Sequence, residues 1–403
     1  MKTTVTTEQK TLLRILQSAL QDRVYTGPFP ENLDWAALAK ESEDQAVAAL
    51  AFFAVEHSAI PAEHLLRWRN MALKECAHQT WVSKAHSDIS ALFDQNGIDA
   101  VTIKGCASAA YFPHPEYRSL GDVDFYVAPE NHEKGNALLL ENGFRPGARI
   151  GHHDRDYFKN NIHYEMHFAI SGVPRGREGE PFLRQLEGLL RDRRTIDTNM
   201  GPAVVPSDFH HGLIILLHTA SHLLSEGIGL RHLCDWAAFV NHFSDDGFCT
   251  LFQEKYQMLS LWRFAQVLTK TCERHLGLAP RDWSGDVEEW ITDGCIKEFL
   301  TSGDGGREKE DKLGSGMLVS DNFSARLSKG SRWQRLLSTA SGVVEMHWPA
   351  SKRYRVLLPL GWGWFGTRYL VRMLLGKRRQ LPLAEMSKEA EERRKLYSEF
   401  GLN

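Results

Sequence analysis

Asp122 and Asp124 are separated by a single valine and are followed by the apolar run FYV. In a β-strand, residues two apart point to the same face, which would place these carboxylates about 7 Å apart between their Cα atoms. Like charges at that spacing repel each other, so a fold that keeps them needs a compensating cation. Mg²⁺ suits such a pair, because it takes one or two protein carboxylates and completes its coordination with water and substrate phosphate. The pair predicts a magnesium site, although a short D-x-D is also typical of a strand end with solvated acids.

A third carboxylate on a neighbouring strand would complete a two-metal site. In such sites, ions about 3.5–4 Å apart clamp the attacking and leaving oxygens of an in-line displacement. Glu165, in the run HYEMH, is the candidate, because the next strand should lie beside the first. The period of two places His163 and His167 on the face of Glu165. These histidines could neutralise the acids, bind phosphate or relay a proton, or they could simply cap a polar strand face.

The elements that must hold these side chains follow from the spacing of apolar residues. Period-two runs alternate with helix-like segments in the middle of the chain, which indicates a unit of strands and helices. The expected strands are 97–105, 121–129 and 161–170, and the expected helices between them are 106–112 and 131–143. Apolar residues at spacings of three and four predict helices on both sides, over 8–95 and over 207–300.

The predicted fold class is therefore α+β, with a small mixed sheet flanked by N-terminal and C-terminal helical regions. A polar, glycine-rich stretch over 301–316 is typical of a loop or linker. Four regions are expected. They are an N-terminal helical region (1–95), a mixed-sheet core (96–205), a helical domain that completes a cleft (206–300), and a linker with a basic C-terminal part (301–403).

The composition is that of an ordinary soluble protein, with 42% hydrophobic and 25% charged residues. A net charge of −3 gives no overall attraction to nucleic acid. Six scattered cysteines without a C-x-x-C pair indicate reduced thiols and a cytoplasmic location, and the N-terminus carries no signal-peptide pattern. The most membrane-like stretch, 356–376, is interrupted by Arg368 and Arg372. We therefore expect no stable membrane insertion.

Positive charge is concentrated near the C-terminus. Residues 323–403 contain 16 Lys and Arg against 6 Asp and Glu. Within them, the segment 351–380 is basic and amphipathic, so it could lie on an anionic membrane surface, or dock an acidic partner or nucleic acid. We expect instead that it packs on the acidic N-terminal body and offsets the charge there.

The stretch around the two aspartates resembles the nucleotidyltransferases of the DNA polymerase beta superfamily. It is most similar to a bacterial family in that superfamily described as uncharacterised nucleotidyltransferases. The family pattern is a strand that ends in Lys-Gly, a short helix, an arginine, then Asp-x-Asp and an apolar strand. Those positions are Lys104, Gly105, Arg118, Asp122 and Asp124. The wider superfamily has Gly-Ser in place of Lys-Gly and a shorter distance to the acids, which leaves open how the triphosphate is held.

The resemblance implies a reaction and a set of roles. The reaction is transfer of a nucleoside monophosphate from an NTP, by default ATP, to an acceptor hydroxyl or phosphate, with release of pyrophosphate. The implied catalytic and metal residues are Asp122, Asp124 and Glu165, which would hold two Mg²⁺ ions, or Mn²⁺. The implied nucleotide-binding residues are Lys104, Gly105, Arg118 and His167. The acceptor, which could be a small molecule, a peptide, a protein or an RNA end, and the oligomeric state stay open.

Two alternatives come from other functional classes. A catalytically silent nucleotide-binding module would keep the pattern without turnover. A zinc-dependent hydrolase would use His218 and His222, which lie four apart on one helix face, although their motif HTASH lacks the glutamate of H-E-x-x-H. The same histidines could line the nucleotide cleft. Arg231 and Asp235, also four apart, are expected to pair on a helix surface or, alternatively, to contact substrate.

Overall fold

The computed structural model describes residues 5–150, 153–174, 176–224 and 227–303, together with positions 341, 344, 348, 351, 354–364, 367 and 392–402. The helices are α1 Thr7–Ala19, α2 Trp35–Asp44, α3 Ala48–Phe53, α4 Ala62–Gln95, α5 Cys106–Ala109, α6 His132–Glu141, α7 Glu180–Leu186, α8 Asp208–Leu224, α9 Leu230–Asn241, α10 Asp245–Phe248, α11 Glu254–Met258, α12 Trp262–Leu276 and α13 Glu289–Ser302. The strands are β1 Ala100–Thr102, β2 Val123–Val127, β3 Arg145–Ile150, β4 Asp154–Lys159, β5 Ile162–His167, β6 Arg194–Thr198 and β7 Gly201–Val205.

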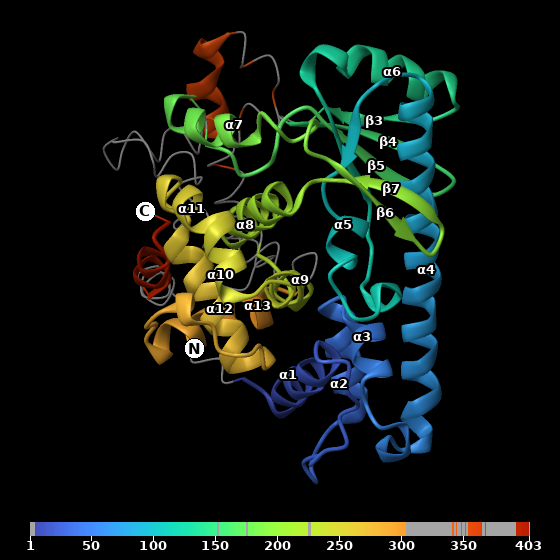
Figure 1. Cartoon of the computed structure of the whole chain (residues 1–403), viewed down its shortest axis with the longest axis vertical. Coiled ribbons are helices and arrows are strands. Elements are labelled where there is room, and N and C mark those ends of the chain that lie inside the picture. The colour runs from blue at the N-terminus through green and yellow to red at the C-terminus, as the bar shows by residue number, and fades with distance from the viewer. Residues whose placement is uncertain are drawn as a thin grey trace.

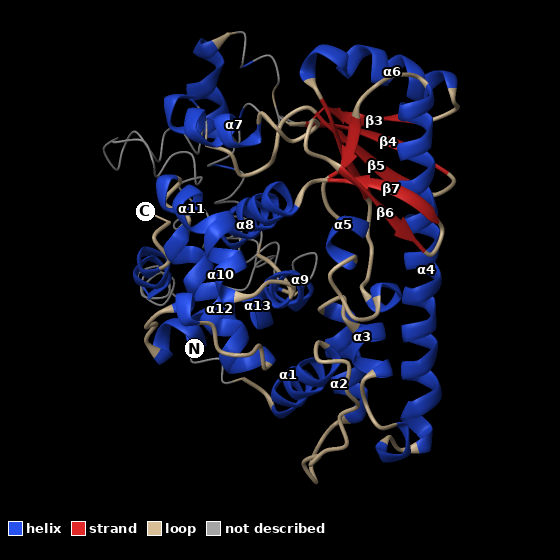
Figure 2. Ribbon diagram, in the orientation of Figure 1, coloured by secondary structure: helices blue, strands red, loops and turns tan. Residues whose placement is uncertain are grey.

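The strands lie along one end of the long helix α4, while α1, α2 and α3 gather at its other end (Figure 1). Helices α8 to α13 form a helical body beside the strands and helices α1 to α3 (Figure 2). In sequence, helices therefore come both before and after the sheet. This arrangement confirms the predicted α+β class with a small mixed sheet flanked by helices.

The elements differ from the expected ones in three places. Within the helical stretch expected over 8–95, a turn in which Ala46 has a φ of 52° separates α2 from α3. The helix expected over 106–112 ends at Ala109. Strands β1, β2 and β5 lie where the apolar runs predict them, but β3, β4, β6 and β7 were not predicted. Strand β3 contains a proline and a glycine, so pairing with its neighbour, and not local pattern, determines its conformation.

Strand pairing places the predicted carboxylates opposite each other. The five-stranded sheet has the order β1-β2-β5-β4-β3, in which β2 and β5 are parallel and the other pairs are antiparallel. After β2 the chain passes through α6 and the β3–β4 pair before β5 returns beside β2. In this register Asp124 lies opposite Glu165, and Tyr126 lies opposite His167.

The alternation of β2 gives the sheet one apolar and one charged face. Val123, Phe125 and Val127 are fully buried. Phe125 packs edge-on against Phe93 of α4, with ring centroids 5.2 Å apart. Because successive residues of a strand point to opposite faces, Asp124 faces away from this core. Burial of the apolar side thus fixes which face presents the carboxylate.

The C-terminal part is described only at some positions. Most of the basic segment 351–380 lies outside the described residues, so its packing on the acidic body stays a prediction. The described residues 392–399 are helical, and Tyr397 donates a hydrogen bond to the carbonyl of Leu223 at 3.0 Å. Among the helices that are described, none has the length and apolar character needed to cross a bilayer.

A glycine allows α8 to pack closely against the helical body. A Cβ at Gly212 would lie 2.7 Å from the ring of Phe239 in α9 and 2.9 Å from that of Phe252. Both rings are fully buried. The close packing of α8 on α9 therefore depends on the missing side chain at this position.

We predict that Gly212→Ala destabilises the fold by about 1–3 kcal/mol, although Gly→Ala within a helix normally stabilises by up to about 1 kcal/mol. The reason is overpacking against two buried rings. Thermal unfolding measures the effect, with Gly363→Ala as the control, because that exposed helical glycine has open space around a new Cβ. Equal unfolding temperatures for Gly212→Ala and the wild type would show that the rings move aside at no cost.

Candidate active site

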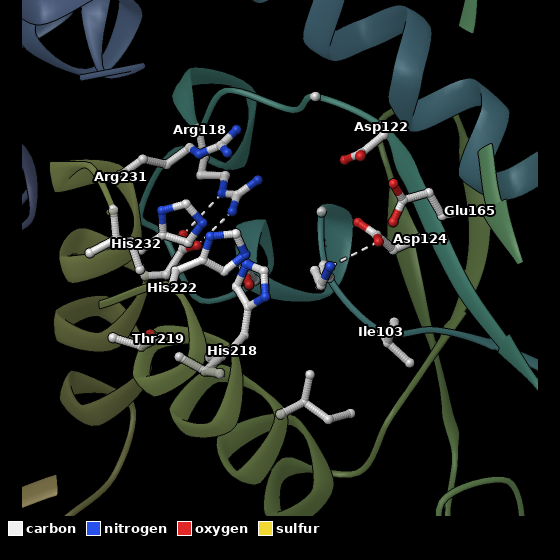
Figure 3. A pocket seen from close by; sticks show the side chains of 18 of the residues that line it. Ile103, Arg118, Asp122, Asp124, Glu165, His218, Thr219, His222, Arg231 and His232 are labelled. Carbon is white, nitrogen blue, oxygen red and sulfur yellow. Dashed lines mark hydrogen bonds and ion pairs between the residues drawn. The ribbon is translucent and has the colours of Figure 1, made fainter. Parts of the chain in front are cut away.

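A cavity of about 510 Å³ lies between the charged face of the sheet and the helices α8 and α9. Asp122, Asp124 and Glu165 form one wall, and side chains of α8 and α9 form the opposite wall (Figure 3). Lys104 and Gly105 also line it, at the turn that follows β1. The three predicted carboxylates and the predicted Lys-Gly pair are thus brought to one cavity.

Glu165 is the centre of the carboxylate wall. One oxygen or nitrogen from each of Asp122, His163 and Glu165 lies within 4.8 Å of the others, and the same holds for Asp124, Glu165 and His167. The strand register explains this, because Asp124 and Glu165 are opposite each other and Asp122 immediately precedes β2. Glu165 belongs to both groups, so two adjacent cations held there would share it.

Two basic side chains offset part of the negative charge. Both bind the same oxygen of Asp124: Lys104 Nζ at 2.9 Å and His167 Nε2 at 2.8 Å. His167 Nε2 also lies 3.3 Å from Glu165 Oε2. Burial alone would raise the pKa of Asp124, but Lys104 and His167 hold that pKa well below its usual range. Asp124 is therefore ionised, and it is the best-compensated acid of the wall.

Asp122 receives less compensation. The charge of Asp124 and, to a smaller extent, burial raise the pKa of Asp122 to about 6. Its nearest basic group among the ion pairs of the described residues is His163 Nδ1, at 3.8 Å. Repulsion between Asp122 and Asp124 therefore remains in the folded protein, and a bound cation would relieve it.

More acids lie along the sheet than the sequence pattern singled out. Asp154 and Asp156 of β4 are buried, and their side-chain oxygens group with Glu165 within 4.8 Å. His153 stacks on His167, with ring centroids 5.6 Å apart, and groups with Asp154 and His167 in the same way. The spacing of two between the aspartates in HHDRD could have indicated that Asp154 and Asp156 share a strand face, but β4 was not predicted. His152 lies outside the described residues.

Gly105 permits a close approach of the chain to α4. Its φ is 57°, a conformation that favours glycine, and a Cβ there would lie 2.5 Å from His86 Nε2. Burial lowers the pKa of His86 to about 4, so this imidazole is neutral. The turn at Gly105 brings Lys104 to Asp124, while the helix that follows, α5, has only four residues.

Arg118 lies in the cavity wall but is held by an acid. It is 6% exposed, and it donates from Nε and Nη2 to the two oxygens of Asp235 at 2.9 and 2.6 Å. Asp235 is also buried, so the expectation that it pairs with Arg231 on a helix surface is wrong. Both Asp235 and Arg231 line the cavity instead. The two residues do lie four apart on α9, but Asp235 is on a buried face of that helix, which the local spacing does not reveal.

His218 and His222 line the cavity together with His232, which the sequence pattern did not indicate. Their ring centroids are 4.3 to 6.2 Å apart. The triplets of described residues that bring ligand atoms within 4.8 Å of one another all lie on the sheet and include none of these three. The geometry of the described residues therefore gives the zinc alternative no ligand set at HTASH.

Comparison with known proteins gives three findings. A family described as uncharacterised nucleotidyltransferase matches residues 31–277, which is more than half of the chain and includes all the acids of the site. The crystal structure of an antigenic nucleotidyltransferase-like protein from Paracoccidioides brasiliensis is similar over 52% of this chain and 94% of that chain, with 16% identity and a TM-score of 0.33. No curated protein matches the chain.

The repulsion between Asp122 and Asp124 predicts an unusual effect of a substitution on stability. In metal-free protein, Asp122→Asn should raise the unfolding temperature, because it removes the charge that Asp124 repels. The raised pKa means that ionised Asp122 destabilises the fold fully above about pH 6. The difference between variant and wild type should therefore shrink as the pH falls from 6 towards 3.8, the ordinary pKa of the group.

Mg²⁺ should reverse that order, because binding stabilises the wild type by mass action and stabilises the variant less. Thermal unfolding in EDTA and in Mg²⁺ makes the comparison, with Asp94→Asn, an exposed position on α4, as the control. A lower unfolding temperature for Asp122→Asn in EDTA would contradict the repulsion between the two aspartates.

Proposed function

Because the chain belongs to the uncharacterised nucleotidyltransferase family, we propose that it transfers a nucleoside monophosphate from an NTP, by default ATP, to an acceptor. An acceptor hydroxyl or phosphate oxygen attacks the α-phosphorus, the bond from that phosphorus to the bridging oxygen breaks, and pyrophosphate leaves. The observation that carries the proposal is the pairing of Asp124 with Glu165, beside Asp122, on the wall of a cavity.

The donor set fits two divalent cations. Asp122, Asp124 and Glu165 supply hard oxygen ligands, which Mg²⁺ and Mn²⁺ prefer. The incompletely compensated charge at Asp122 supports cation binding, since its pKa is raised by a neighbouring carboxylate. When bound, the ions would neutralise charge on the reacting phosphate and on the attacking and leaving oxygens. Asp122, Asp124 and Glu165 are thus the proposed metal ligands and catalytic residues.

The remaining residues of the site position the nucleotide. Cations on the carboxylates would compete with Lys104 for Asp124, and the freed ammonium would then bind a phosphate oxygen. Gly105 lets the backbone approach that phosphate, and His167 remains as a donor between Asp124 and Glu165. Arg118 lines the cavity with a guanidinium orientation fixed by Asp235. Catalysis is then a matter of positioning and charge stabilisation.

The proposal also covers the proton transfer and the cellular location of the protein. Glu165 helps to deprotonate an acceptor hydroxyl, since it lies where both groups of potential ligands meet. All six cysteines are free thiols, which fits a reaction in the reducing cytoplasm.

The proposed reaction is tested by following a label on one phosphate of ATP. Protein is incubated with a cell extract as the source of acceptors and with ATP labelled at the α- or at the γ-phosphate. We expect the α-label in a new product and the γ-label in pyrophosphate. Transfer of the γ-label to the product would identify a kinase and contradict the proposal.

Glu165→Gln keeps the shape of the side chain and removes its charge. We predict that it lowers the rate of α-label transfer at least about hundredfold, a loss typical of removing one group that stabilises transition-state charge. Nucleotide binding should fall much less, because two aspartates still hold the metal. Glu141→Gln, an exposed change at the end of α6, is the matched control. A rate for Glu165→Gln equal to that of the control would place the third carboxylate elsewhere, with Asp154 or Asp156 next.

A further inference from the structure

The outer face of α4 carries large apolar side chains that are open to solvent. This helix runs along one edge of the molecule (Figure 1). Leu66, Leu73 and Trp81 are 56%, 48% and 55% exposed. A single exposed apolar residue is ordinary on a protein surface, whereas several that lie together on one element indicate a contact surface. The residues that line the active-site cavity come from other elements, so the proposed reaction does not account for this face.

These apolar side chains belong to one continuous stripe along the helix. Seven exposed residues follow one another at spacings of three or four, as in the seam of a coiled coil. They are Glu63, Leu66, Asn70, Leu73, Ala77, Trp81 and Lys84, which we call the α4 stripe. At a rise of 1.5 Å per residue, the α4 stripe is about 32 Å long.

The α4 stripe lies on the side of the helix that faces away from the core. Each residue advances the helix by about 100°, so the position two residues later lies roughly on the opposite side. Trp68 and Gln79, which come two residues after Leu66 and Ala77, are both buried. The α4 stripe is therefore the outward crest of the helix, along which a second helix can lie.

The order of residues in the α4 stripe is complementary to itself when it is reversed. If two copies of α4 are aligned antiparallel about a two-fold axis at Leu73, Glu63 of one copy lies beside Lys84 of the other. In the same alignment, Leu66 of one copy lies beside Trp81 of the other. The two-fold axis repeats both pairs. Opposite charges thus meet at both ends of the α4 stripe, and apolar side chains meet between them.

This self-complementarity favours a second copy of the chain over an unrelated protein. A two-fold contact requires that the same surface serves both partners, so that each paired position occurs twice. A contact with a different protein imposes no such order on the α4 stripe. Asn70 lies beside Ala77 of the second copy in this alignment, and a polar residue in a helix seam helps to fix the register.

We propose that two copies of this chain pair antiparallel along the α4 stripe, with the two-fold axis at Leu73. Parallel pairing would bring Glu63 beside Glu63 and Lys84 beside Lys84, and these like charges would repel. The antiparallel dimer leaves both active sites open. The reason is that α4 packs on the apolar face of the sheet, through contacts such as that of Phe93 with Phe125, whereas the cavity lies on the charged face.

Sedimentation velocity of the full-length protein, between about 1 and 100 μM, tests the dimer. We expect a reversible monomer–dimer equilibrium for the wild type. Leu66→Glu should raise the dissociation constant at least about hundredfold, because the symmetry buries the new charge in the contact twice. Trp81→Glu should act in the same way, and it is the second variant if Leu66→Glu does not fold. Met258→Glu, a change at a 59% exposed apolar side chain outside α4, is the control and should have no effect.

Charge reversal tests the register of the two helices. Glu63→Lys alone and Lys84→Glu alone should each raise the dissociation constant about tenfold, because each creates two like-charge contacts in an antiparallel pair. The double variant has opposite charges at both ends again, so its dissociation constant should return close to that of the wild type. In a parallel dimer, none of these three variants would differ from the wild type, since the like-charge contacts would persist in all of them.

The proposal is overturned if the wild type remains monomeric up to about 100 μM, because the α4 stripe would then serve a different partner. It is also overturned if a dimer forms that neither Leu66→Glu nor Trp81→Glu weakens. A dimer that both of these changes weaken, but that the single charge reversals leave unchanged, would overturn the antiparallel register. None of these measurements involves a nucleotide, so they are independent of the label-transfer test.

Discussion

Repulsion between neighbouring carboxylates is the constraint that organises this site. The parallel register of β2 and β5 sets Asp124 opposite Glu165, and Asp122 directly precedes the same strand. Lys104 and His167 offset the charge of Asp124, yet the repulsion that remains still raises the pKa of Asp122 to about 6. The fold tolerates this arrangement because the opposite face of β2 is fully buried. The repulsion that remains between these carboxylates favours the binding of cations.

The second constraint is the distance between the two walls of the cavity. A buried ion pair joins Arg118, which precedes β2, to Asp235 in α9. Removing one partner of such a pair typically costs about 3–5 kcal/mol, because the other charge is left buried and unpaired. The absence of a side chain at Gly212 then lets α8 pack on α9. Together these contacts hold the α8–α9 side of the cavity opposite the carboxylates.

The sequence was most informative where local pattern and chemistry coincide. Period two in β2 and β5 was enough to predict both strands and the shared face of Asp124 and Glu165, because apolar burial enforces that period. It was not enough for β3 and β4, whose residues are mostly polar and whose strand conformation comes from pairing with β5. The sequence pattern therefore did not place Asp154 and Asp156 at the site.

Long-range pairing explains the remaining differences. The spacing of Arg231 and Asp235 predicts a local pair, but Asp235 is buried and binds Arg118, which lies 117 residues away in sequence. No local pattern contains that contact. His232 joins His218 and His222 only because α9 packs beside α8. The helical half of the site thus depends on tertiary packing, whereas Asp122, Asp124 and Glu165 could be predicted from the sequence.

The central claim is that Asp122, Asp124 and Glu165 bind divalent cations that hold a nucleoside triphosphate. The most direct measurement is a crystal structure with Mn²⁺ and a non-hydrolysable NTP, in which anomalous scattering locates the metal. The account predicts Mn²⁺ peaks in contact with oxygens of these three residues and of the triphosphate. Mn²⁺ bound only at His153 and Asp154, or a nucleotide bound away from the carboxylate wall, would contradict it.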